Sequence, residues 1–214
     1  MILDRNQIRS FWEQLQETIE QLLSSRSDDR FEAEPLLKQY REQLQKIDRN
    51  LTFHFQSDAD NDGSVEMVFG CDGFPESIHA VLSLIGAAPE LSGIEFKAFN
   101  NRYDPVPLSV NIGDEYCEIG DFWCRLVVVN KHLHLEVYLE DAPTVLDMDP
   151  RVEAVMIYLD ALIGEYELMT KVWALDWFEL PPSPEDHGLT RLLDLREGFD
   201  EIKTQVNPIG LTLH

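Results

Sequence analysis

One order of elements occurs twice in this sequence, and it limits the folds that the chain can adopt. Residues 51–69 and residues 121–140 each contain two stretches in which apolar and polar residues alternate, which predicts a β-hairpin. A pattern with helical spacing, and then an apolar strand pattern, follow each predicted hairpin. The sequence Leu-Ile-Gly ends both predicted helices, at residues 84–86 and 162–164. This shared tripeptide is too short to establish a duplication.

The second predicted hairpin, residues 121–140, indicates its own register. If Asn130 and Lys131 occupy the two turn positions, every cross-strand pair on one face is apolar, as a buried face requires. The opposite face then pairs Arg125 with Glu136, which carry opposite charges. We expect this second face to be exposed and to offer the candidate binding residues Trp123, Arg125, His132, His134, Glu136 and Tyr138.

Two amphipathic helices are predicted before the first hairpin. Apolar residues recur with helical spacing in residues 8–23 and 36–47, and the polar sequence SSRSDD separates the two patterns. We expect a helical hairpin over residues 1–48 that packs on an α+β domain over residues 49–214, with both parts in one folded unit. The expected fold class is α+β: a mainly antiparallel sheet from two hairpin-helix-strand units, with a C-terminal helix at about residues 189–203.

The segment LIGEYELMTKVWALDWFELPP, residues 162–182, supplies the strand of the second unit. We expect this strand to begin directly after Gly164, with its acidic residues at a solvated entry. Both faces of residues 172–178 are largely apolar, which is typical of a strand that is covered on both sides. We therefore expect Trp173 and Trp177 to be buried and structural.

The same segment holds the candidate catalytic residues. Glu165 and Glu167 alternate on the expected strand, so their carboxylates would lie ~7 Å apart, a separation within the range that glycosidases use. Lys171 follows on the same side. No second feature of a sugar site accompanies these residues, so we favour a solvated strand end over an active site.

A run of aspartates raises the question of a metal site. Asp58, Asp60 and Asp62, followed by Gly, match the first half of a calcium-binding loop. The twelfth position of such a loop should be Glu and is Phe69, and the flanking patterns predict strands. We therefore favour a polar hairpin turn, with weak calcium binding as the alternative. His132 and His134 lie on one strand face and could share a metal ion, but the sequence shows no third ligand for it.

Charge is the strongest global feature of the sequence. It has 40 Asp and Glu residues against 17 Lys and Arg residues, a formal net charge of −23. Such a surface repels nucleic acid and anionic membranes, and no phosphate-binding glycine motif suggests a nucleotide cofactor. Three widely spaced cysteines indicate reduced thiols. No membrane-spanning run or signal peptide is recognisable, so we expect a cytoplasmic protein without a cofactor.

Four sequence features together resemble a known family. They are an FW pair in the first predicted helix, NLTFHF at residues 50–55, LIGAAPEL at residues 84–91 and LDALIGEYELMTKV at residues 159–172. The resemblance covers roughly residues 11–181 and is to a family of bacterial cytosolic proteins without an assigned function. It implies a bacterial cytosolic protein, and it brings no catalytic residues with it.

Three functions remain open on this evidence. We favour an acidic protein-binding module, such as an inhibitor or immunity-type partner of a basic protein, because charge is the one strong signal. A carboxylate-dependent hydrolase and a weak calcium-binding protein are the alternatives. The absence of a recognisable catalytic set makes us lean away from an enzyme.

Overall fold

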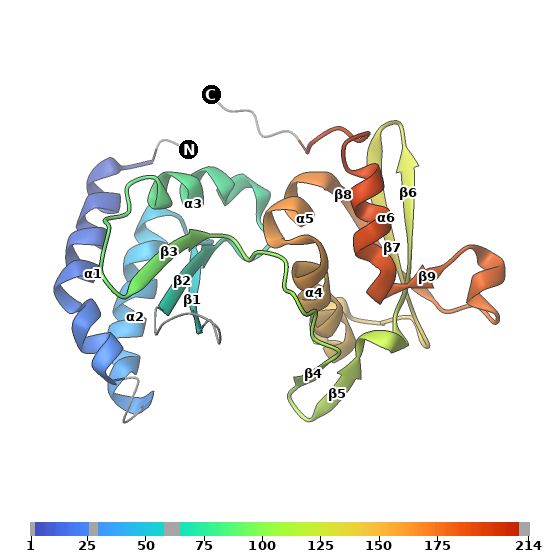
Figure 1. Cartoon of the computed structure of the whole chain (residues 1–214), viewed down its shortest axis with the longest axis horizontal. Helices are drawn as coiled ribbons and strands as arrows, with labels where there is room; N and C mark the ends of the chain where they lie inside the picture. Colours follow the sequence, from blue (N-terminus) through green and yellow to red (C-terminus); the bar gives the residue numbers. More distant parts are fainter. Residues whose placement is uncertain (1–2, 26–29, 58–64, 210–214) are drawn as a thin grey trace. The chain divides into compact units, whose positions relative to one another are not determined.

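The chain folds into two compact units, which are described separately. The computed structural model describes residues 3–25, 30–57 and 65–209, and the units are Met1–Phe99 and Asn100–His214 (Figure 1). Helices and mixed sheets occur together in both, so the expected α+β class is confirmed. No helix among the described residues is both long enough and apolar enough to cross a membrane.

The first unit places a helical pair and a third helix around a three-stranded sheet. Its elements are α1 Arg5–Ser25, α2 Arg30–Ile47, β1 Thr52–Ser57, β2 Val65–Gly70, α3 Ile78–Ile85 and β3 Ile94–Ala98. Aromatic rings fill its interior, where Phe11 and Trp12 of α1 contact Phe69 of β2 at centroid distances of 5.9 and 5.6 Å. The indole N–H of Trp12 donates to the carbonyl of Leu84 at 2.9 Å, which ties α1 to α3.

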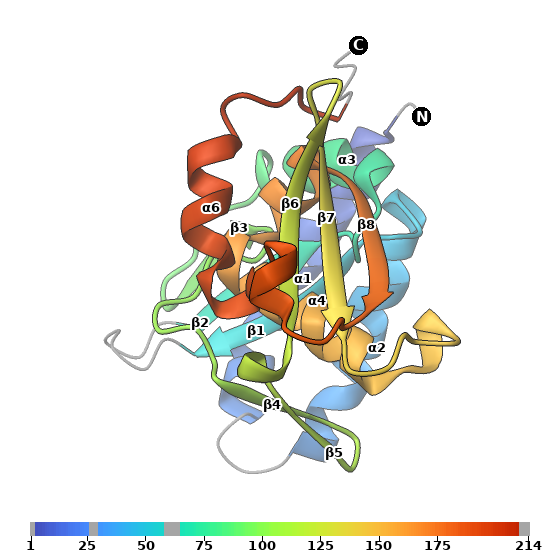
Figure 2. The same ribbon diagram turned by 90° about the vertical axis from the view of Figure 1, so that its right-hand side faces the viewer.

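The second unit is built on a four-stranded sheet in the order β8-β7-β6-β9 (Figure 2). A small hairpin of β4 and β5, which the sequence analysis did not predict, precedes this sheet. The elements are β4 Ser109–Ile112, β5 Glu115–Glu118, β6 Trp123–Val129, β7 His132–Leu139, α4 Pro150–Ile163, α5 Glu165–Lys171, β8 Val172–Glu179, β9 Thr190–Arg191 and α6 Leu195–Ile202.

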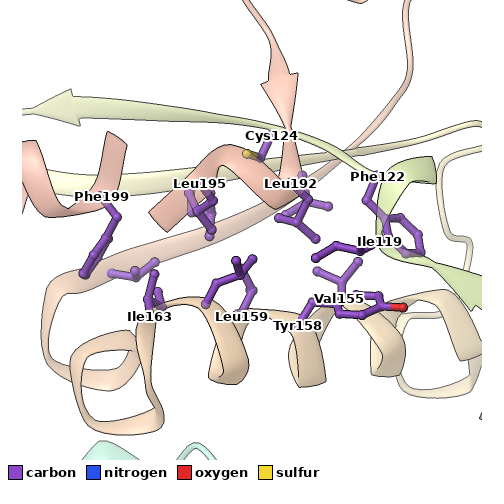
Figure 3. Close-up of a cluster of buried hydrophobic side chains, with 14 of the residues drawn as sticks. Ile119, Phe122, Cys124, Val155, Tyr158, Leu159, Ile163, Leu192, Leu195 and Phe199 are labelled. Atoms are coloured by element: carbon purple, nitrogen blue, oxygen red, sulfur yellow. The ribbon is translucent and has the colours of Figure 1, made fainter. Parts of the chain in front are cut away.

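The core of the second unit lies between α4, the sheet and α6. Val155, Leu159 and Ile163 of α4 point toward Leu195 and Phe199 at the other side of the core (Figure 3). The helix starts at Pro150, where the Asp149 side chain caps it by accepting a hydrogen bond from the backbone N–H of Arg151 at 3.0 Å.

The predicted register of the second hairpin is confirmed. Arg125 lies opposite Glu136, and the apolar pairs occupy the face that is directed into the core. Asn130 and Lys131 form the turn with φ values of 52° and 65°, as a two-residue turn with both residues left-handed requires. Cross-strand pairing of apolar side chains therefore determined this register, as expected.

The order hairpin, helix, strand does occur twice. In each unit the strand that follows the helix lies parallel to the second strand of the hairpin: β3 pairs with β2, and β8 pairs with β7. Antiparallel pairs outnumber parallel ones, as expected, but the strands of the described residues form three separate sheets in place of one, and the two larger sheets each contain one parallel pair. A helix that connects two strands of one sheet returns the chain in a parallel direction, which explains the mixture.

The expected strand from Glu165 onward is wrong over its first seven residues. These residues form α5, in which the backbone N–H of Leu168 donates to the carbonyl of Gly164 at 2.9 Å. Glu, Leu, Met and Lys all favour helix, and Gly164, with φ of 86°, lets the chain leave α4 and begin a new helix at once. The strand begins only at Val172.

The expected burial of Trp173 is also wrong. Its side chain is 51% exposed, whereas Trp177 packs partly buried against the core. Leu133 pairs with Val172 and His134 with Ala174, so Trp173 is the extra residue of a β-bulge and turns away from the regular pleat.

The predicted C-terminal helix is shorter than expected. The α-helix covers Leu195–Ile202, whereas residues 189–194 contain β9 and a 3-10 turn, Leu192–Asp194. The aspartate run at Asp58, Asp60 and Asp62 lies outside the described residues.

Candidate functional site

The two carboxylates of α5 have structural partners. Glu165 is 7% exposed, its Oε2 accepts a hydrogen bond from the backbone N–H of Asn100 at 3.0 Å, and its own N–H donates to the Asn100 carbonyl at 3.1 Å. Because both groups bind one peptide segment, Glu165 holds the start of the second unit against α5.

Glu167 belongs to a network of ion pairs. It accepts hydrogen bonds from Arg102 Nη2 at 2.7 Å and from Lys203 Nζ at 2.9 Å. Arg102 also donates to both carboxylate oxygens of Asp200 at 2.7 Å, and this contact holds the pKa of Asp200 well below its usual range. Because the carboxylate of Glu167 is already bound by two cations, this arrangement favours fastening of α5 to α6 over general acid-base chemistry. Lys171, the third candidate, lies partly exposed in the last turn of α5.

The cysteines offer no nucleophile to a catalytic site. Cys71, Cys117 and Cys124 are all buried, and none of them forms a disulfide bond. Burial raises the pKa of the Cys124 thiol to about 11, so the thiolate is scarce near neutral pH.

The predicted binding face of the second hairpin is formed, and a polar network lies on it. Arg125 Nε donates to Glu136 Oε2 at 2.8 Å, and Arg125 Nη2 donates to the hydroxyl of Tyr138 at 3.1 Å. That hydroxyl in turn donates to Glu136 at 2.7 Å. Burial, together with this contact to Glu136, raises the pKa of Tyr138.

One end of this face is covered, contrary to the expectation that it is exposed. Trp123 and Tyr138 are only 5% and 8% exposed, because Leu189 and the segment before β9 pack on them. The guanidinium of Arg191 stacks on Trp123 at 3.9 Å from the ring centroid.

The other end of the face remains open. There the ring of His132 lies 4.1 Å from that of Trp173, and His134 lies 3.9 Å from the carboxylate of Asp176. Among the described residues, no group of three or more His, Cys, Asp or Glu side chains is arranged to hold a metal ion.

A groove of about 600 Å³ lies between β6 and α6. It exists because β9 has only two residues and pairs only with Trp123 and Cys124 of β6. Over residues 125–129, no other strand in the described part of the chain lies on that side of β6. Leu126, Leu195 and Ile202 provide apolar lining. A side chain at Gly198 would begin 3.4 Å from Leu126, so glycine allows α6 to approach β6 closely.

Acidic side chains line the helical wall of this groove. Asp194, Glu197 and Glu201 are all exposed, and their spacing of three and four residues places them on one stripe, which starts at the end of the 3-10 turn before α6 and continues along the helix. None of the three has an ion-pair partner among the described residues. The spacing of these carboxylates is visible in the sequence, but the groove is not, because it depends on the short strand β9 and on tertiary packing.

Comparisons with known proteins add nothing to this geometry. No protein-family model, curated protein or solved structure matches the chain.

Proposed function

We propose that this chain is an acidic, cytosolic protein-binding module whose partner is a basic protein. An inhibitor or immunity-type protein of a basic toxin is one form that such a module takes. The second unit supports this proposal because residues 100–214 contain 22 Asp and Glu residues against 8 Lys and Arg residues. The two signs of charge are also used differently in this unit.

Most cations of the second unit are already engaged within it. Four of them, Arg102, Arg125, Arg151 and Lys203, form ion pairs with neighbouring carboxylates. Arg196 instead donates to three backbone carbonyls, those of Tyr103, Ala161 and Leu162. Most positively charged side chains therefore bind partners within the unit, while many carboxylates face solvent.

The acidic groove is the single observation that carries the proposal. Asp194, Glu197 and Glu201 line it beside apolar side chains, and none of the three forms an ion pair within the described chain. Arg125 also lines the groove, but its guanidinium is already paired with Glu136. Lys and Arg side chains combine an aliphatic stem with a charged end, so they suit a floor and rim of this kind. Long-range attraction between opposite charges also speeds the encounter of two proteins.

The experiment is affinity capture from a native extract, followed by measurement with the purified partner. A variant with Asp194→Asn, Glu197→Gln and Glu201→Gln is compared with a control that carries Asp114→Asn, Glu118→Gln and Glu140→Gln at exposed positions. Both variants lose the same charge, so only the location differs. We expect the groove variant alone to lose most of the binding, and added salt to slow association with the wild type. Equal binding by the two variants, or binding that salt does not affect, would contradict the proposal.

A further inference from the structure

We propose that the basic partner supplies an extended segment, which adds to the second sheet as a strand along the free edge of β6. This inference rests on the proposed function and specifies its binding mode. The segment would occupy the groove beside α6 and continue the sheet where β9 ends. Three features of the described residues support it: the orientation of the β6 backbone, the direction of α6, and the lining of the groove.

The backbone of β6 presents hydrogen-bonding groups to the groove. The N–H of Leu192 donates to the carbonyl of Phe122 at 2.9 Å, so residue 122 faces the β9 side. Backbone groups alternate in direction along a strand, so those of Leu126 and Val128 face the same side. The two-residue turn after Val129 leads to the same conclusion. The residues that flank such a turn are hydrogen-bonded to each other, so the backbone groups of Val129, and of every second residue before it, face β7.

These groups lie where no strand of the described chain reaches them. β9 stops at Arg191, and the chain then turns into α6. An exposed row of strand N–H and C=O groups is a template on which an extended peptide can pair. The free part of β6, residues 125–129, is long enough for about five residues of such a peptide, or ~17 Å.

The acidic stripe runs alongside this edge. Figures 1 and 2 both show α6 lying lengthwise beside β6. Asp194 and Glu201 are seven residues apart, or ~10 Å along the helix axis. Alternate side chains of an added strand are ~7 Å apart, so two or three of them can face this stripe.

The lining of the groove predicts the sequence pattern of the added segment. Its inward side chains meet the apolar Leu126 and Ile202 before they reach the carboxylates. Lysine or arginine at every second position suits this lining, because the aliphatic part of the side chain covers the apolar residues and its charged end reaches the carboxylates. The positions between them face away from the groove and need only favour extended structure, as threonine does.

The opposite edge strand, β8, lacks these features. It carries the half-exposed Trp173 and Phe178 and the acidic Asp176, and none of its residues lines the groove. The strand β8 therefore serves as an internal control for where the peptide binds.

Two synthetic peptides of identical composition test the inference. One alternates lysine and threonine over eight residues, and the other repeats Lys-Lys-Thr-Thr twice. Only the alternating peptide can present all its lysines on one side of a strand. With the full-length protein, we expect it to bind at least roughly fivefold more tightly, since each misplaced lysine loses an exposed charge contact.

Amide hydrogen exchange gives the second readout. On binding of the alternating peptide, we expect the amides of Leu126 and Val128 to gain protection. The amide of Val127, which already faces β7, and the amides of β8 should stay unchanged.

The outcomes separate this inference from the proposed function. If both peptides bind equally and Leu126 stays unprotected, but the groove variant lowers binding, strand addition is refuted while the acidic protein-binding role stands. Protection at β8 in place of β6 also refutes it. If neither peptide binds, or if the groove variant binds as well as the wild type, both the inference and the proposed function fail.

Discussion

Replacing Arg102 with glutamine tests how the second unit is held together. The Arg102 side chain is 25% exposed and donates to Asp200, to Glu167 and to the carbonyl of Ile163, the last at 3.1 Å. Partly exposed ion pairs contribute about 0.5–1 kcal/mol each, and the bond to the carbonyl contributes about 1 kcal/mol. We therefore expect Arg102→Gln to lower the free energy of unfolding by about 2 kcal/mol.

Lys203 limits the loss in this variant. Its ammonium group lies 2.9 Å from both Glu167 and Asp200, so neither carboxylate is left without a cation when Arg102 is replaced. Replacing both cations leaves two neighbouring carboxylates unneutralised. The double variant Arg102→Gln with Lys203→Gln should therefore lose about 1 kcal/mol more than the sum of the single variants.

Urea unfolding at neutral pH measures these differences, with Arg151→Gln as a control that breaks a separate pair with Asp149. The pH dependence adds an independent test. Because Arg102 lowers the pKa of Asp200 in the folded state, this contact stabilises the fold above the unfolded value of about 4, and the stability is lost as the pH falls below it. Arg102→Gln should therefore lose less stability on acidification than the wild type. Additive single variants, or identical acid profiles, would refute the reasoning.

Three further variants test burial and ionisation. Tyr158→Phe should cost about 1–2 kcal/mol, because the buried hydroxyl donates to a backbone carbonyl at 2.7 Å, and thermal unfolding measures the loss. Burial, and then the charge of Glu165, raise the pKa of Asp160 to about 7. The free energy of unfolding of the wild type should therefore fall as the pH rises from about 4 to about 7. The urea midpoint of Asp160→Asn should not fall over this range. Trp123→Ala should cost about 3–5 kcal/mol and Trp173→Ala below about 1.5 kcal/mol in urea unfolding, because only the first is buried.

Each of these variants has an outcome that contradicts its basis. A neutral Tyr158→Phe would mean that the carbonyl finds another donor. Asp160→Asn with the same pH profile as the wild type would mean that Asp160 is ionised in the folded state. Equal losses at Trp123 and Trp173 would mean that the bulge in β8 does not expose the second ring.

Local patterns predicted the parts of the fold that depend on neighbours in sequence. The register around Arg125 and Glu136 follows from alternating side chains and a two-residue turn, and both signals lie within twenty residues. The start of α4 follows from Asp149 and Pro150. An aspartate before a helix accepts a hydrogen bond from an N–H of its first turn, and proline suits the first helical position. The repeated order of elements also follows from local periodicity.

The parts that failed depend on distant contacts. Seven residues from Glu165 fit an alternating pattern and a helical pattern equally well, and their packing decided between them. The separation into several sheets leaves no trace in strand periodicity, because each strand alternates in the same way in one sheet or in several. The partners of Arg102 lie 65 and 98 positions away in the sequence, so no spacing rule relates them.

The turn of the second hairpin offers a practical route to a more stable protein. Lys131 has φ of 65°, a left-handed conformation that costs roughly 1–2 kcal/mol for most residues but little for glycine. Its backbone carbonyl accepts a hydrogen bond from the N–H of Asn207 at 2.8 Å, and a glycine keeps that carbonyl. Lys131→Gly therefore relieves an unfavourable turn without altering any buried side chain. The resulting protein is a tolerant background, in which strongly destabilising core variants remain folded enough to be assayed.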